Sequence, residues 1–330
     1  MKTFGRYCHL FWLLITPIIC LTGCSEDISV INPGPPIPVV YGVFDLNQSV
    51  HYIKLTKTFA GKTDPYTLAL DHDQIFYSDA QVFLTQESGG NRMPFHLETG
   101  IPRSDGSFPE YPNEVYMLNQ KLYPGNYQLN VIIPSEKDTL TARFSFINTF
   151  SVITPKAGFK RFYFYEDPIL FTWLADPSAG LYEITLNLQY EEWMKTGASR
   201  VCSVSFTRQL DPSELEFEKN RYSYRFYSDS FFAHLGVSIR QNTAVDYLKP
   251  VALGLLITAA DTTLAKYLNW FHLEIDDQVN PNGNVNGAIG VVGTKYSIPF
   301  RDLILSPRSQ DSLVRGRYTK KLGFVNNPEW

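Results

Sequence analysis

The stretch PVVYGVFDLNQSVHYIKLTKT, residues 38–58, decides the fold class of this chain. Residues 38–44 form a short apolar run, and residues 50–58 alternate along the backbone with a period of two, which is typical of a half-buried strand. This alternation places His51, Ile53 and Leu55 on one face and Tyr52, Lys54 and Thr56 on the other. Only residues 45–49 connect the two runs, so we expect an antiparallel hairpin.

Further strand patterns follow residue 58, and near residue 150 the succession of strands and turns begins again. The chain holds 23 Phe, 20 Tyr and 5 Trp together with 21 Gly and 21 Pro, and aromatic strands separated by turn residues favour an all-β body. The expected strands are residues 80–85, 93–97, 114–118, 125–133, 139–146, 168–174, 181–190, 201–210 and 251–258. Their spacing predicts two β-sandwiches of the immunoglobulin or fibronectin III kind, over residues 39–148 and 149–330.

Helical signals are few and mostly in the C-terminal half. Asp261 is a helix-capping residue, and Leu264, Tyr267, Leu268 and Phe271 recur at helical spacing, so an amphipathic helix is expected over residues 262–271. Residues 211–214 and 229–235 are candidates for short helices. Residues 62–78 are polar and predict a loop with one helical turn, and a proline-rich loop follows at 102–112.

The N-terminus has the pattern of an export signal. Lys2, Arg6 and His9 precede an apolar run of twelve residues, 10–21, which is shorter than the roughly 20 residues that a membrane-spanning helix needs. Leu21-Thr-Gly-Cys24 resembles the lipobox of bacterial lipoproteins. That resemblance implies that residues 1–23 are removed and that Cys24 carries a diacylglycerol and a further acyl chain such as palmitate. The alternative is a plain secreted protein in which Cys24 is incidental.

The segment after the cysteine, residues 24–38, predicts a tether. Ser25-Glu-Asp27 resembles the signal that sends Bacteroidota lipoproteins to the cell surface, although a solvated linker is also polar. Residues 31–38 contain too much proline for a helix or a central strand and predict an extended spacer. We therefore expect a lipid-anchored outer-membrane protein that is exposed at the cell surface.

Charge and cysteine content exclude some classes of function. The formal charge of −4 becomes −6 when Lys2 and Arg6 leave with the signal, and a mildly acidic body argues against nucleic acid as a partner. Cys8 and Cys20 also leave, so Cys202 is the one cysteine without an assigned role, and no disulfide can form within the mature chain. Its strand-like setting predicts an inert buried thiol.

Two parts of the chain resemble a known family. Residues 38–45 and 51–61 look like the opening of an uncharacterised family of Bacteroidota outer-membrane lipoproteins, known as a domain of unknown function. Residues 265–269 followed by the glycine-rich stretch 280–293 are similar to its ending. The resemblance implies a β-sandwich lipoprotein, often encoded near outer-membrane transporters, and implies no known activity.

Four groups of residues could have either a chemical or a purely structural role. The glycine run 282–293 lacks the helix that follows a phosphate loop, which favours a turn or bulge. His72 has acidic neighbours and is either a metal ligand or part of a solvated loop. Adjacent carboxylates at 191–192 and 276–277 point to opposite faces of a strand, so neither pair is a catalytic dyad. The aromatic tract 159–165 stacks sugars if it is exposed and otherwise packs inside the protein.

No catalytic constellation, metal set or cofactor motif emerges from these positions. The leading hypothesis is a lipid-anchored envelope protein, more plausibly a binding or accessory protein than an enzyme, that works with an outer-membrane nutrient transporter. Two alternatives stay open: a hydrolase with carboxylates brought together from distant positions, and a structural or adhesion protein. The sequence predicts lipidation of Cys24 and assigns no catalytic, metal or cofactor-binding residue.

Overall fold

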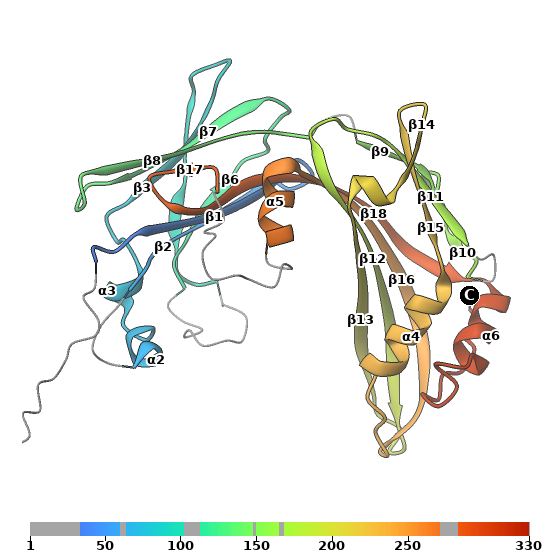
Figure 1. Ribbon diagram of the computed structural model, residues 1–330. Helices are drawn as coiled ribbons and strands as arrows, with labels where there is room; N and C mark the ends of the chain where they lie inside the picture. The colour runs from blue at the N-terminus through green and yellow to red at the C-terminus, as the bar shows by residue number, and fades with distance from the viewer. Residues whose placement is uncertain are drawn as a thin grey trace, which may run out of the picture.

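The computed structural model describes residues 34–59, 64–101, 113–147, 150–164, 168–270 and 283–329. The described chain is all-β with a few short helices, and its strands form three sheets. The largest sheet, sheet A, has the order β13-β12-β16-β18-β1-β2-β6-β5 and runs through both halves of the molecule (Figure 1). Sheet B has the order β17-β8-β7-β3-β4, and sheet C the order β14-β15-β11-β9.

The N-terminal sandwich begins with the predicted hairpin. β1 (Pro38–Asp45) and β2 (Val50–Lys57) pair antiparallel, and His51, Ile53 and Leu55 are buried as the alternation indicated. Sheet B covers this face, and apolar side chains from both sheets form one core. The other strands here are β3 (Gln81–Gln86), β4 (Arg92–Pro94), β5 (His96–Glu98), β6 (Val115–Asn119), β7 (Asn126–Ile133), β8 (Asp138–Ser145) and β17 (Val285–Asn286).

The C-terminal sandwich packs the other half of sheet A against sheet C and two helices. Leu186 in β12, Leu255 in β16 and Trp173 in β11 are fully buried in its core, together with Phe231 of α4. Its strands are β9 (Ser151–Thr154), β10 (Arg161–Phe162), β11 (Ile169–Leu174), β12 (Ala179–Met194), β13 (Ser199–Leu210), β14 (Glu216–Glu218), β15 (Arg221–Phe226) and β16 (Val245–Asp261). The helices α4 (Ser228–Ser238) and α6 (Pro307–Arg315) lie beside these sheets (Figure 1).

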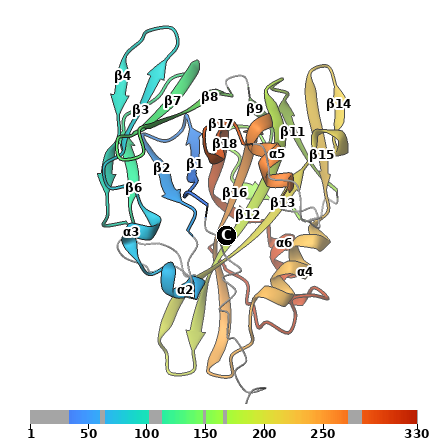
Figure 2. The ribbon, with the colours of Figure 1, turned by 60° about the vertical axis from the view of Figure 1, so that its left-hand side comes forward.

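One strand joins the two sandwiches. β18 (Ile289–Leu305) pairs parallel with β1 over residues 289–295 and antiparallel with β16 over residues 295–303. Figure 2 shows β1, β18 and β16 side by side in the middle of the molecule. The division expected after residue 148 stays a prediction, to which the structure adds that β17 and the first half of β18 pair with strands of the N-terminal half.

Helix α5 (Thr262–Trp270) lies at this junction and confirms the amphipathic helix predicted to begin at Thr262. The Asp261 carboxylate accepts the N–H of Leu264 at 2.7 Å and thereby caps the helix. Its other oxygen accepts the hydroxyl of Thr294 at 3.0 Å and also the N–H of that residue, so one buried carboxylate ties the helix to β18. Phe271, the last residue of the predicted helix, lies outside the described residues.

The sheet comes very close to this helix at Gly293. A methyl group at that position would lie 2.8 Å from Cβ of Leu264, closer than packed carbon atoms approach one another. The small cluster of Leu264, Ala265 and Val291 forms at the same place. Glycine at position 293 therefore lets the helix rest directly on β18.

The polar segment 62–78 and the short helices are close to expectation. Within residues 64–78, α2 (Pro65–Leu68) and α3 (His72–Ile75) are single helical turns. Asp211 caps η1 (Pro212–Glu214), and α4 extends the expected helix at both ends. The proline-rich loop 102–112 lies outside the described residues.

Candidate ligand-binding sites

The predicted lipidation site cannot be placed, because Cys24 and the export signal lie outside the described residues. The tether is described only from residue 34, and residues 34–37 have no regular secondary structure before β1 begins. In the parts of the chain that the structure covers, no helix has both the length and the apolar character needed to span a bilayer.

His72 forms an ion pair with a buried carboxylate. Its Nε2 lies 2.6 Å from Oε1 of Glu114, whose side chain is 8% exposed, and its Nδ1 lies 3.3 Å from Oδ1 of Asp73. Burial, the largest single influence, lowers the pKa of His72, but the hydrogen bonds and charges of Asp73 and Glu114 together outweigh it, and the net shift is upward. Among the described residues, no group of His, Cys, Asp and Glu side chains could hold a metal ion here.

Lys54 completes this polar cluster. Its ammonium donates to the Glu114 carbonyl at 2.7 Å and to the side chain of Asn113, and it lies 4.5 Å from the ring centre of Phe76. The His72 ring lies 4.9 Å from the same ring. The cluster thus fastens α3 to β2 and to the start of β6, and we assign it a structural role.

The adjacent carboxylates of β12 confirm the expectation that they do not act together. Glu191 accepts the indole N–H of Trp193 at 2.9 Å, whereas Glu192 is buried and pairs with Arg200 at 2.6 Å. Neighbouring strand residues face opposite sides of a sheet, and these partners differ accordingly. The pair at 276–277 lies outside the described residues.

Cys202 lies on β13 opposite Tyr190 of β12 and is half-buried. Burial raises the pKa of the Cys202 thiol, and the charge of Glu192 raises it further. A higher pKa leaves less of the nucleophilic thiolate, so this environment does not activate the cysteine.

The described part of the glycine run forms a turn and the start of a strand, as the sequence indicated. Gly287, with φ of 83°, turns the chain between β17 and β18. Gly290 has φ of 122°, and a methyl group there would meet the Val40 carbonyl oxygen at 2.0 Å. No helix follows this run, so it lacks the backbone geometry of a phosphate site.

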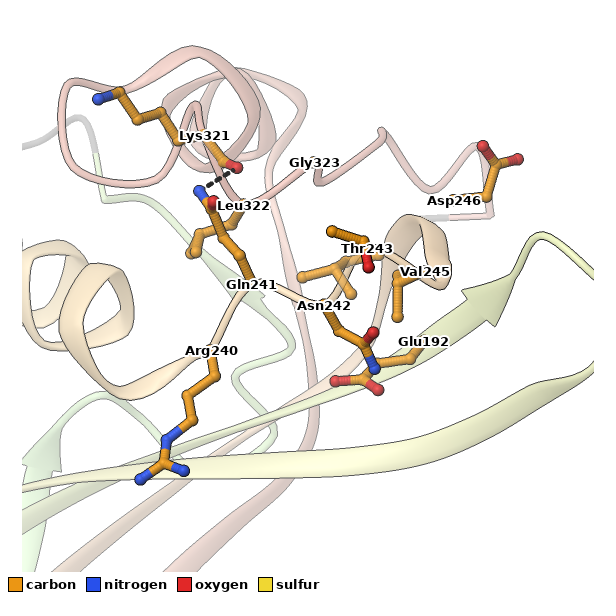
Figure 3. Close-up of a pocket in the computed structure, with 11 residues that line it drawn as sticks. Glu192, Arg240, Gln241, Asn242, Thr243, Val245, Asp246, Lys321, Leu322 and Gly323 are labelled. Atoms are coloured by element: carbon orange, nitrogen blue, oxygen red, sulfur yellow. Dashed lines mark hydrogen bonds between the residues drawn. The ribbon is translucent and has the colours of Figure 1, made fainter.

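A polar pocket of about 230 Å³ lies where the loop between α4 and β16 meets the C-terminal segment. Figure 3 shows one side of it closed by the side chain of Gln241, which donates to the Lys321 carbonyl at 2.9 Å. Its ionisable lining residues have both signs: Glu192, Asp246, Arg240 and Lys321. This mixture does not select a ligand by charge.

The aromatic tract contributes to a larger pocket of about 510 Å³ in the C-terminal sandwich, which we call the aromatic pocket. Some residues of the tract pack inside the protein and others line the pocket, which are the two roles that the sequence left open. Phe164 packs into the core and stacks on Phe231 with ring centres 5.1 Å apart. Phe159 and Tyr163 line the pocket with the buried Phe162, whose ring contacts that of Phe159 edge to face.

The rest of the lining of the aromatic pocket comes from residues that sequence reasoning treated only as strand and turn. It consists of Thr154, Pro155, Lys156, Pro168, Ile169, Leu170 and Phe171. Thr154 is the last residue of β9, and Pro155 and Lys156 follow it. The other four include the beginning of β11. Since β9 and β11 pair antiparallel, these two segments meet only in the folded chain, and no local pattern marks them as a site.

Comparison with known proteins yields little for this chain. No family model matches it, and no curated protein sequence matches it. Among solved structures, the FN1-FN3 domains of chicken CNTN1 are 10% identical, with 83% of this chain and 69% of that chain covered at a TM-score of 0.20. InvD of Yersinia pseudotuberculosis is 8% identical, with 67% and 93% covered at a TM-score of 0.13. Neither structure carries an inference about this chain.

Proposed function

We propose that this chain is a lipid-anchored protein of the bacterial outer membrane, displayed at the cell surface, that binds a ligand in the aromatic pocket. The anchor would be the acyl chains on Cys24, and the tether up to residue 38 would hold the two sandwiches away from the membrane. The resemblance to an uncharacterised lipoprotein family supports this proposal and points to a nutrient transporter as partner. Residues 38–45, 51–61, 265–269 and 280–293 carry that resemblance.

The observation that carries the binding role is the aromatic pocket. Its volume of about 510 Å³ lies within the range of roughly 300–1,000 Å³ that small-molecule sites occupy. Phenyl rings and aliphatic side chains make most of its wall, while Lys156 and Tyr163 provide polar groups. Such a lining suits a ligand with an aromatic or alkyl body and an anionic group that pairs with the Lys156 ammonium.

Binding of an aromatic sulfonate dye to the full chain tests this role. Anilinonaphthalene sulfonate combines both features, so we expect saturable fluorescence enhancement at one site. Leu170→Asp adds a negative charge to the pocket wall at a side chain that is 44% exposed, and the dye should bind at least tenfold more weakly. Leu70→Asp, at a 64% exposed leucine outside the pocket, is the matched control. Equal binding by both variants would remove the aromatic pocket as the site.

The anchor is tested separately, so that either half of the proposal can fail alone. Mass spectrometry of the protein from bacterial membranes should find residue 24 at the N-terminus with acyl chains attached. Cys24→Ser should release the chain from the membrane fraction. An unmodified Cys24 would refute the anchoring role and leave the pocket untouched.

A further inference from the structure

Strand β13 forms an unusually long open edge of sheet A. It has 12 residues, whereas β5, β9, β14, β4 and β17, which end the sheets elsewhere, have between 2 and 4 residues. Its register with β12 runs from Tyr182 opposite Leu210 to Trp193 opposite Ser199 without a bulge. Natural sheets usually shorten or distort their edges, because an open edge is a template for another strand.

Helix α4 contacts this edge near the middle of β13. Nε2 of His234 lies 2.8 Å from the carbonyl oxygen of Ser205, and the His234 ring packs against Phe206 at 5.5 Å. The Ser205 carbonyl therefore points away from β12. Because the backbone groups alternate along a strand, the N–H and C=O groups of Ser203 and Val201 point the same way. In the described chain no hydrogen bond reaches them, which leaves the edge of residues 199–203 open.

This open stretch is complementary to itself. An antiparallel copy centred on Val201 places Val201 opposite Val201, Ser199 opposite Ser203 and Arg200 opposite Cys202. The Val201 side chain is 68% exposed in the single chain, and an apolar pair and two hydroxyl pairs are favourable cross-strand neighbours. Arg200 faces Cys202 directly and has Arg200 of the other copy only as a diagonal neighbour, and each guanidinium is already paired with Glu192 of its own chain.

We propose that two copies of this chain associate through antiparallel pairing of residues 199–203, with Val201 on the two-fold axis. The facing residues 201 and 201, and 199 and 203, then exchange both of their backbone hydrogen bonds, and sheet A continues from one copy into the other. A register centred on Ser203 is excluded, because Val201 would then face Ser205, whose outward carbonyl is occupied by His234. This dimer is independent of the aromatic pocket and of the lipid anchor.

Cysteine cross-linking in the full chain tests the register. In a Cys202→Ser background, Val201→Cys places two cysteines in a directly facing pair, with Cα atoms about 5.5 Å apart, which a disulfide can bridge. Ser203→Cys, two residues along the same edge, would lie about 13 Å from its copy along the strand direction. We expect a disulfide-linked dimer from Val201→Cys and at least tenfold less from Ser203→Cys. More cross-linking at residue 203 than at residue 201 would overturn the proposed pairing.

Charge at the axis tests the dimer without a cross-link. Light scattering of the full chain in mild detergent should give the mass of a dimer for the natural sequence. Val201→Lys places two ammonium groups opposite each other and should give a monomer. Val43→Lys, at a 42% exposed valine of β1 in the N-terminal sandwich, is the matched control and should stay dimeric. A monomeric natural chain, or a dimer that survives Val201→Lys, would refute the proposal.

Discussion

The carboxylate of Asp261 should be among the most important single groups for stability. It caps α5 and accepts two hydrogen bonds from Thr294, a residue with no exposed surface. Loss of a helix cap costs about 1 kcal/mol. The buried N–H and hydroxyl of Thr294 would also lose their acceptor, which costs about 1–3 kcal/mol. Asp261→Ala should therefore lower the free energy of unfolding by about 2–4 kcal/mol, a large part of the roughly 5–15 kcal/mol of a typical protein.

Urea unfolding followed by tryptophan fluorescence measures this change. Asp211→Ala is the matched control, because Asp211 also caps a helix, with its carboxylate 2.8 Å from the N–H of Ser213 and 2.6 Å from its hydroxyl. Those groups are exposed, so water replaces the lost acceptor and the cost should be about 1 kcal/mol or less. If the two variants lose equal stability, the argument that burial makes Asp261 special is wrong.

Two further predictions concern the His72 cluster and the helix–sheet contact. The pKa of His72 is raised in the folded chain, so its pairing with Glu114 and Asp73 stabilises fully below the unfolded pKa of about 6.5 and less as pH rises through the folded pKa. His72→Gln should abolish that part of the pH dependence of the free energy of unfolding. His96→Gln, at a side chain that is 55% exposed, is the control and should leave it unchanged. Equal pH profiles for His72→Gln and the natural chain would contradict this prediction. Gly293→Ala forces a methyl group against Leu264 and should cost about 1–3 kcal/mol in thermal or urea unfolding. Gly89→Ala, with nothing within 4 Å, should change stability by about 0.5 kcal/mol at most, and equal effects of the two would refute the packing argument.

Local patterns predicted most elements of this fold because each depends on neighbours in the chain. The alternation in residues 50–58 is the direct cause of the burial of His51, Ile53 and Leu55 in β2. The carboxylate at position 261 and the helical spacing after it likewise predicted α5. Helix α6 was missed, although Ser306 as cap and Pro307 at the first position provide a local signal for it.

Local patterns in the sequence could not predict which distant strands pair with each other. β18 pairs with β1 across some 250 positions, for example at Val291 and Tyr41, and no local pattern identifies that partner. The aromatic pocket shows the same limit. The tract 159–165 was recognisable by its composition. The rest of the pocket lining, near Pro155 and Ile169, forms only when β9 and β11 pair.

The shared strand β18 has a consequence for the history and handling of this protein. Its first half completes the sheet beside β1, and its second half lies beside β16 in the other sandwich. Fibronectin-type modules joined end to end can be cut apart or shuffled as cassettes, but a gene fragment that stops near residue 148 would omit β18, one of the two strands that pair with β1. We therefore expect the two halves to be expressed, and to unfold, together.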